Sequence, residues 1–214
     1  MKIFNILNTR EIEFLKSQLK ECSWSDGSSS AEGNAKKIKK NKEIRSNDPN
    51  FQIFINSLMT VFNNSNIKSY TFIKELINPM VSKYSIGDGY DWHVDVALLA
   101  GRRTDLSFTL FLSDYAEYDG GELEIEVNSK KIKIKPKSGD IVIYPSGLLH
   151  KVHEVTKGER IVIIGWLTSH VKIEEHRQRL YELAIELTKL REVFKINSPE
   201  LDRLYYQLIR DYSN

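Results

Sequence analysis

The chain has 214 residues, of which 41% are hydrophobic, and its formal net charge is +2. This is enough for one domain with a sizeable core and appended helices, while the near balance of charge argues against binding to nucleic acid through overall charge. The lone Cys22 cannot form an internal disulfide, the apolar opening Ile3 to Leu7 is too short for a signal peptide, and no run approaches membrane-spanning length. We therefore expect a cytoplasmic protein without a membrane partner.

Two helices are predicted in the first third of the chain. Residues 9–20 carry Ile12, Leu15 and Leu19 at helical spacing. Asp48-Pro49 predicts the cap and first turn of a second helix. The apolar positions of this second helix are Phe51, Ile55, Leu58, Met59 and Phe62. We expect both helices to brace a β-core from outside.

The segment between these helices has the composition of a loop. Residues 25–34 are rich in glycine and serine, and residues 36–42 form a lysine run. Together they predict a mobile, solvated loop. The lysines could suggest nucleic-acid binding, but no aromatic residues alternate with them, so nucleic acid is not the expected partner.

Short strand-like segments separated by turns fill the middle of the chain. Residues 83–90 predict a strand and turn, and residues 107–113 a further strand. Apolar residues then alternate on both sides of a turn at Asn128-Ser129, which predicts a hairpin with one wet face. Another short strand follows at 141–144. Strands at this spacing, without helical periods between them, predict an all-β sandwich or barrel, and a jelly roll (double-stranded β-helix) fits best.

The last part of the chain returns to a helical pattern. Residues 173–194 carry a leucine stripe, and Asn197-Ser198-Pro199 starts a second helix. We expect a helical hairpin whose stripes pack on the core, with a homodimer contact as the second interpretation. The chain thus divides into residues 1–171, with the N-terminal helices and jelly roll, and residues 172–214, the C-terminal hairpin.

The pair His93 and Asp95 carries the strongest functional signal. Residues two apart on a strand project from the same face, so this imidazole and carboxylate can hold one metal ion. Two histidines and one carboxylate on one face of an octahedron are typical of non-haem Fe(II) oxygenases, because the remaining positions stay open for substrate and O2. A third ligand must come from a distant position.

His150 and His153 are the candidates for that third ligand. They are separated by an odd number of positions, so they cannot both face inward on one regular strand. Periodicity alone does not choose between them. His170 and His176, at the end of the last strand and on a helix, are not expected to bind the metal.

Several strings of the chain resemble the PKHD-type hydroxylases, a branch of the prolyl 4-hydroxylase-like, iron- and 2-oxoglutarate-dependent dioxygenases. They run over residues 84–95, 103–107, 112–123 and 144–160. In that family the second histidine lies in a Leu-His-x-Val string ten positions before an arginine, and here these residues are His150 and Arg160. The resemblance therefore implies His150, with His93 and Asp95, as the metal ligands.

The resemblance also implies the cofactors and the reaction. Arg160 would bind the distal carboxylate of 2-oxoglutarate, since a guanidinium fork matches a carboxylate, and Tyr84 would add a hydroxyl. Fe(2+), 2-oxoglutarate and O2 are then required, and L-ascorbate is a candidate cofactor. The expected reaction hydroxylates an unactivated C–H bond of a peptidyl proline or lysine, or of an amino acid, and releases succinate and CO2.

Two alternatives use the same fold. A jelly-roll metal-binding module or a cupin-like isomerase would bind a metal without activating O2, but it would not need Arg160. A nucleic-acid demethylase would resemble its relatives in a second arginine six positions after the first, where this chain has Trp166. The pair Asp91-Trp92 before His93 departs from the family strings at the expected cavity entrance.

Overall fold

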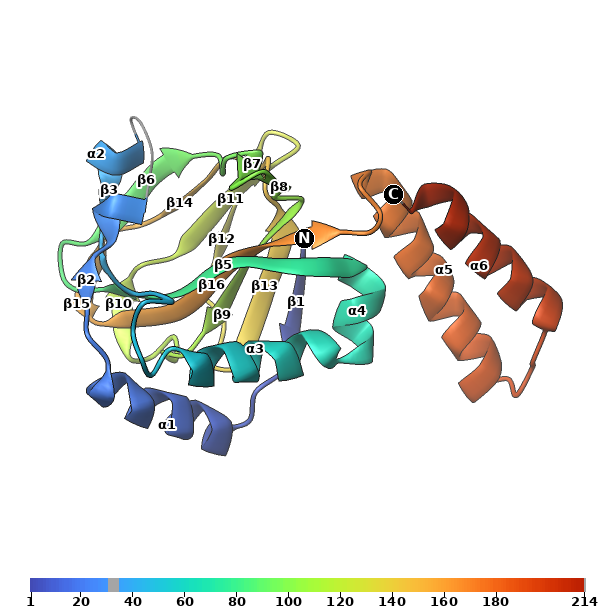
Figure 1. Ribbon diagram of the computed structural model, residues 1–214, viewed down its shortest axis with the longest axis horizontal. Coiled ribbons are helices and arrows are strands. Elements are labelled where there is room, and N and C mark those ends of the chain that lie inside the picture. Colours follow the sequence, from blue (N-terminus) through green and yellow to red (C-terminus); the bar gives the residue numbers. More distant parts are fainter. Residues whose placement is uncertain (31–34, 214) are drawn as a thin grey trace.

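Two antiparallel β-sheets form the centre of the computed structural model, which describes residues 1–30 and 35–213 (Figure 1). The larger sheet contains β1 (Lys2–Asn5), β2 (Ser25–Asp26), β4 (Lys42–Ile44), β5 (Ile73–Tyr84), β9 (Leu106–Phe111), β13 (Asp140–Pro145) and β16 (Arg160–Ser169). The smaller sheet contains β3 (Lys39–Lys40), β6 (Gly89–His93), β11 (Leu123–Val127), β12 (Lys130–Ile134) and β14 (His150–Val152). Two short pairs, β7 (Leu98–Leu99) with β8 (Arg102–Arg103) and β10 (Tyr118–Gly120) with β15 (Val155–Gly158), complete the strands.

The strand order establishes the predicted jelly roll. It is β1-β13-β9-β16-β5-β4-β2 in the larger sheet and β12-β11-β14-β6-β3 in the smaller one. Strands that are neighbours in a sheet are mostly distant in sequence, because the chain crosses repeatedly from one sheet to the other. After β14 the chain leaves the smaller sheet, forms β15 and enters the larger sheet as β16. This path carries His150 and Arg160 to different sheets of one sandwich.

Every residue of strand β9 is buried, because other parts of the protein pack on both faces of this strand. Phe108 and Leu110 belong to the core between the larger sheet and the helices. Phe111 points to the other face and packs in a core between the sheets with Ile125 and Val142. The helices and the smaller sheet therefore cover opposite faces of the larger sheet.

The predicted hairpin is present as β11 and β12. Val127 and Lys130 are paired, and the two residues between them, Asn128 and Ser129, both have positive φ, at 50° and 61°. Positive φ at both central positions is the geometry of a two-residue turn that matches strand twist. The turn thereby fixes the register of the hairpin.

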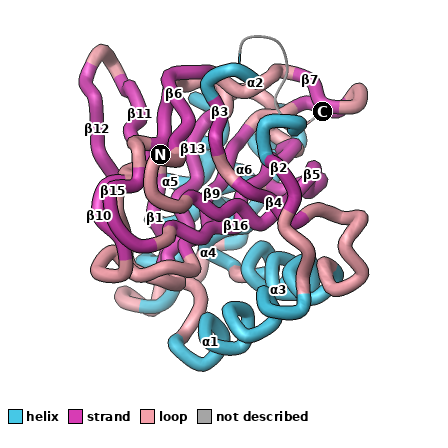
Figure 2. The backbone as a smooth tube through the Cα atoms, turned by 90° about the vertical axis from the view of Figure 1, so that its left-hand side faces the viewer, coloured by secondary structure: helices cyan, strands magenta, loops and turns pink. Residues whose placement is uncertain are grey.

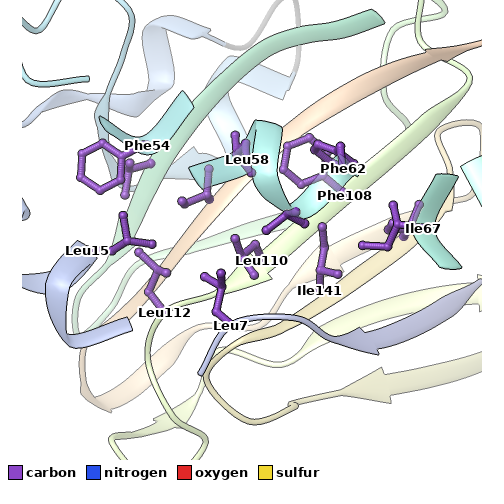
Figure 3. Packing of buried hydrophobic residues seen from close by; sticks show 14 of the residues in the cluster. Leu7, Leu15, Phe54, Leu58, Phe62, Ile67, Phe108, Leu110, Leu112 and Ile141 are labelled. Atoms are coloured by element: carbon purple, nitrogen blue, oxygen red, sulfur yellow. The ribbon is translucent and has the colours of Figure 1, made fainter. Parts of the chain in front are cut away.

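Three helices cover the outer face of the larger sheet: α1 (Thr9–Gln18), α3 (Gln52–Asn63) and α4 (Ser65–Thr71). A short 3₁₀ helix, η1 (Leu19–Glu21), continues α1. Figure 3 shows the helix residues Leu15, Phe54, Leu58 and Phe62 in one cluster with strand residues that include Leu110. Figure 2 shows α1 and α3 along one side of the strands. These contacts confirm the prediction that the N-terminal helices pack on the outside of the β-core.

The predicted start of the second helix is wrong by three residues. Helix α3 begins at Gln52, and Asp48 instead accepts hydrogen bonds from the backbone N–H groups of Ser23 and Asn50, at 2.7 and 2.9 Å. Asp48 therefore connects the turn before α3 to the backbone of Ser23, just after η1. The expected core position Met59 is also 50% exposed, because it lies on the outer side of α3.

The segment predicted as a solvated loop is largely folded. It contains β2, a 3₁₀ turn η2 (Gly27–Ser30), the single turn α2 (Ala35–Ile38), β3 and β4; the predicted loop positions 31–34 lie outside the described residues. β3 pairs with β6, and β4 pairs with β5, so both sheets gain a strand from this segment. Lys39, part of the lysine run, is buried. The prediction failed because the residue of the lysine run that is buried is itself charged, so no apolar pattern marked these strands.

The C-terminal hairpin consists of α5 (Glu174–Glu192) and α6 (Pro199–Tyr212). α5 packs against α4, where the rings of Tyr70 and Tyr181 meet edge to face with their centroids 5.2 Å apart. α6 packs on α5, with His176 stacked on Tyr212, and none of its residues is buried. In Figure 1 the hairpin projects away from the sheets. No helix in the described part of the chain is long and apolar enough to cross a membrane.

Candidate active site

His93, Asp95 and His150 converge at one point of the smaller sheet. His93 ends β6, Asp95 follows two positions later, and His150 begins β14 directly opposite His93. One ligand atom from each residue lies within 4.8 Å of those of the other two. Two imidazole nitrogens and a carboxylate oxygen thus face a common point.

Hydrogen bonds orient all three groups. His93 Nδ1 donates to the carbonyl oxygen of Asp91 at 2.7 Å, and His150 Nδ1 donates to that of Leu148 at 2.9 Å. Since a carbonyl can only accept, both Nδ1 atoms carry a proton, and in the neutral tautomer of each ring the lone pair is then on Nε2. The hydroxyl of Ser107 donates to Asp95 Oδ2 at 2.5 Å. Such outer contacts hold metal ligands in position.

The environment of His93 keeps its imidazole neutral. Burial, and next the adjacent His150, lower the pKa of His93 to about 4. The two rings lie 4.2 Å apart between centroids, so a proton on one would disfavour a proton on the other. The neutral imidazole is the form that coordinates a metal.

The other histidines lie elsewhere. His153 Nε2 is 2.5 Å from Glu124 Oε2, and His153 is not part of the cluster. His176 stacks on Tyr212, and His170 is exposed after the end of β16. The structure therefore brings together the three residues expected as ligands and none of these three histidines.

Arg160 lies in the same cavity as the triad, although it belongs to the larger sheet. The cavity has a volume of about 190 Å³ and is lined by His93, Asp95, His150, Tyr84 and Arg160, among others. Arg160 is only 1% exposed. Its guanidinium carbon lies 5.1 Å from the ring centroids of Tyr84 and Phe111.

The charge of Arg160 has no protein partner among the described residues. None of the ion pairs in this part of the chain includes Arg160, and its Nε lacks a hydrogen-bond acceptor. A buried cation without a counter-ion is costly. The site is therefore built for an anionic ligand.

Gly121, within the string 112–123, leaves space for the Arg160 side chain. Gly121 has φ +64°, and a Cβ there would lie 3.1 Å from Arg160 Cδ and 3.0 Å from a ring carbon of Tyr118. A larger residue would push against the arginine side chain. Gly121 thus fixes where the guanidinium can lie.

The cavity-lining residues that were not anticipated from the sequence include Ser30, Lys39, Tyr144 and Trp166. Trp166 follows Arg160 by six positions on β16, so period-two alternation from the anchor could have placed it on the same face. Tyr144 lies on β13 two positions after Val142, an inter-sheet core residue, and the same alternation applies. Ser30 and Lys39 carried no such signal, because their segment has no strand periodicity.

Sequence comparisons assign the chain to a family. The profile of the 2OG-Fe(II) oxygenase superfamily matches residues 79–168. A PKHD-type hydroxylase of Prochlorococcus marinus (strain MIT 9301) is 36% identical over 219 positions, which cover 98% of this chain and 97% of that protein. Another, from Shewanella frigidimarina, is 34% identical over 221 positions, covering 99% and 98%.

Solved structures share the fold. A prolyl-4-hydroxylase of Pseudomonas putida aligns with a TM-score of 0.60 at 16% identity, over 78% of this chain and 91% of that one. HygX from Streptomyces hygroscopicus, crystallised with nickel, 2-oxoglutarate and hygromycin B, aligns with a TM-score of 0.60 at 11% identity, over 78% and 82%. The chain belongs to the PKHD-type hydroxylases of the 2OG-Fe(II) oxygenase superfamily, and it is a 2-oxoglutarate-dependent dioxygenase.

Proposed function

We propose that His93, Asp95 and His150 hold the Fe(II), that Arg160 and Tyr84 bind 2-oxoglutarate, and that the enzyme hydroxylates a peptidyl proline or lysine, or an amino acid. The observation that carries the proposal is the buried, unpaired Arg160 in the cavity of the metal-binding triad. A site that bound only a metal ion would not need the positive charge of Arg160.

The donor set fits iron. Imidazole nitrogens suit Fe(II), whereas Ca²⁺ and Mg²⁺ prefer oxygen ligands. Structural zinc sites supply four protein ligands, and the described residues offer three at this point. Three ligands from one side leave coordination positions for a chelating co-substrate and O2.

The arginine fits the co-substrate. 2-Oxoglutarate has a 2-oxo acid end that chelates a metal and a distal carboxylate that needs a cation. A planar guanidinium offers that carboxylate two parallel hydrogen bonds. Tyr84 is buried beside Arg160, and burial raises the pKa of its hydroxyl, so Tyr84 stays protonated and can donate to the same carboxylate.

When bound, Fe(II) supplies O2 activation, in which 2-oxoglutarate is converted to succinate and CO2 and one oxygen atom enters a substrate C–H bond. The protein positions the reactants. Ser107 fixes Asp95, the two backbone carbonyls fix the histidine rings, and Tyr144 contributes buried wall to the cavity. Burial of these groups keeps bulk water from the reacting atoms.

Two observations support a protein or peptide substrate. Val94, Val96 and Leu98 flank Asp95 and are 54%, 41% and 63% exposed, so an apolar surface lies beside the triad, and such surfaces often bind partners. A prolyl hydroxylase from Trichoplax adhaerens, solved with a peptide fragment of the hypoxia inducible factor, has the same fold, with a TM-score of 0.56 at 17% identity. An extended segment could cover the apolar residues while one side chain enters the cavity.

A lysate experiment tests the substrate. The iron-loaded enzyme is incubated with proteins and metabolites of its source cells under O2 and 2-oxoglutarate, and products are searched by mass spectrometry for a gain of one oxygen. The His150→Ala variant serves as control. We expect oxidised proline or lysine residues that are absent with the control; oxidation confined to metabolites other than amino acids would contradict the proposed substrate class.

A further inference from the structure

A second buried polar cluster borders the cavity, and the mechanism above does not use it. The side chain of Lys39 is 5% exposed, and its Nζ lies 2.5 Å from both Glu43 Oε1 and Ser30 Oγ. Lys39 and Ser30 line the same cavity as His93 and Arg160. The N-terminal segment thus places a second cation in the wall of the site.

The ammonium of Lys39 has a free donor. A lysine carries three N–H donors, and Glu43 and Ser30 take two of them. Within residues 1–30 and 35–213 no third acceptor lies within hydrogen-bond distance of Nζ. Buried polar groups are almost always hydrogen-bonded, so a donor left over beside a cavity calls for an acceptor on a ligand.

The cluster also carries surplus positive charge. Glu43 is fully buried and forms a second ion pair with Arg45, at 2.7 Å. The carboxylate of Glu43 therefore pairs with two cations, and the net charge of these three side chains is +1. In a site of low dielectric constant this charge attracts an anion more strongly than it would in water.

Strand pairing places Lys39 beside the metal-binding residues. Lys39 is opposite Tyr90 in the β3–β6 pair, its ammonium lies 5.5 Å from the Tyr90 ring centroid, and that ring stacks on His93 at 3.5 Å. Lys39 is close enough to contribute to the lowered pKa of His93, after burial and His150. Arg160 instead lies beside Tyr84, which also lines the cavity, and its guanidinium packs between the rings of Tyr84 and Phe111.

We propose that Lys39 is a second anion-binding residue of the site, which binds the carboxylate at the metal-chelating end of the 2-oxo acid while Arg160 binds the distal carboxylate. The inference rests on the proposed function. It has a structural consequence: the bound 2-oxo acid adds a contact to Lys39 of β3, a strand that pairs with β6. Ligand binding then stabilises this strand pair.

Calorimetry with the Mn(II)-loaded protein and 2-oxoglutarate tests the proposal, because no turnover is needed. We compare wild type with Lys39→Met, Lys40→Met and Arg160→Met. Lys40 is the matched control, since its side chain is 71% exposed and it does not line this cavity. We expect Lys39→Met to weaken 2-oxoglutarate binding at least tenfold and Lys40→Met to change it less than twofold.

The variants separate the two proposals. If Arg160→Met binds 2-oxoglutarate like wild type, the proposed function fails. If Arg160→Met loses binding but Lys39→Met retains it fully, the role of Lys39 alone is overturned.

A Glu43→Gln variant distinguishes anion binding from a structural role of the ion pair. If Lys39 only held the segment in place, loss of its partner would weaken 2-oxoglutarate binding as much as Lys39→Met does. If Lys39 binds the anion, Glu43→Gln leaves its charge uncompensated and binding is retained or tightened. Equal weakening by the two substitutions would overturn the proposal.

Hydrogen exchange of the wild-type protein gives a readout that does not depend on variant folding. Binding of 2-oxoglutarate to the Mn(II) form should slow exchange of the Lys36–Lys40 amides at least threefold, while amides of the distant helix α6 stay unchanged. Unaltered exchange at Lys36–Lys40 under saturating ligand would contradict the proposal.

Discussion

His93 and His150 are direct partners on antiparallel strands, and their ring centroids lie 4.2 Å apart. Each Nδ1 is bound to the carbonyl oxygen two positions earlier in the chain. The same local device therefore orients both rings, although the residues are far apart in sequence. The pairing of β6 with β14 converts these two local arrangements into one metal-binding face.

Replacing Arg160 by lysine should weaken 2-oxoglutarate binding. Lysine keeps the charge but loses the bidentate geometry, and its point charge would sit deeper in the cavity wall. Full removal of a buried charge partner costs about 2 to 5 kcal/mol, and we expect lysine to recover less than half of that. Calorimetry on the metal-loaded protein measures the difference.

Arg102→Lys is the control for this change. Arg102 forms an ion pair with Glu75 in which both side chains are 44% exposed, so the substitution should leave 2-oxoglutarate affinity unchanged. Equal affinities of Arg160→Lys and wild type would dismiss the anchor role of Arg160.

The adjacent residues Leu58 and Met59 provide a packing test. Leu58 is fully buried between α3 and the larger sheet, and its replacement by alanine should cost about 2 to 5 kcal/mol of unfolding free energy. Met59→Ala, on the exposed side of the same helix, should change it by less than about 0.5 kcal/mol. Urea denaturation measures both; similar losses would mean that α3 is rotated relative to the sheet.

Cys22 should react slowly with alkylating reagents. Burial, and next the neighbouring Asp48, raise the pKa of its thiol to about 11. At pH 8 roughly one thiol in a thousand is then ionised, against about a quarter for a free cysteine with a pKa of about 8.5, and the thiolate is the reactive form.

The pH dependence of iodoacetamide labelling measures this shift. Labelling of the native protein should accelerate tenfold per pH unit up to about pH 11, and Asp48→Asn should move the midpoint downward. A midpoint near that of a free cysteine would contradict the described environment of Cys22.

The sequence predicted the jelly roll where the strand pattern is regular, as in the hairpin around Asn128-Ser129. It did not predict the long strand β5, because Asn78-Pro79 in its middle is typical of a turn. The structure accommodates this pair in an irregularity of register opposite Gly165, where Asn78 adopts a positive φ of 41°. Tertiary pairing with β16 thus overrides a local turn signal.

Part of the candidate site could not be predicted from the sequence either. Alternation could not separate His150 from His153, because β14 has only three residues and its register with β6 shifts between His150 and Val152. Lys39 lies in a lysine run, which normally marks a solvated surface, and only the partner Glu43 makes its burial tolerable. Both features depend on contacts between distant segments.

The most direct test of the iron and 2-oxoglutarate site is anaerobic absorption spectroscopy. Addition of Fe(II) and 2-oxoglutarate to the wild-type protein should give a weak visible charge-transfer band with a stoichiometry of one, and His153→Ala should give the same band. His150→Ala should give none. A band that survives in His150→Ala but disappears in His153→Ala would contradict the proposed ligand set.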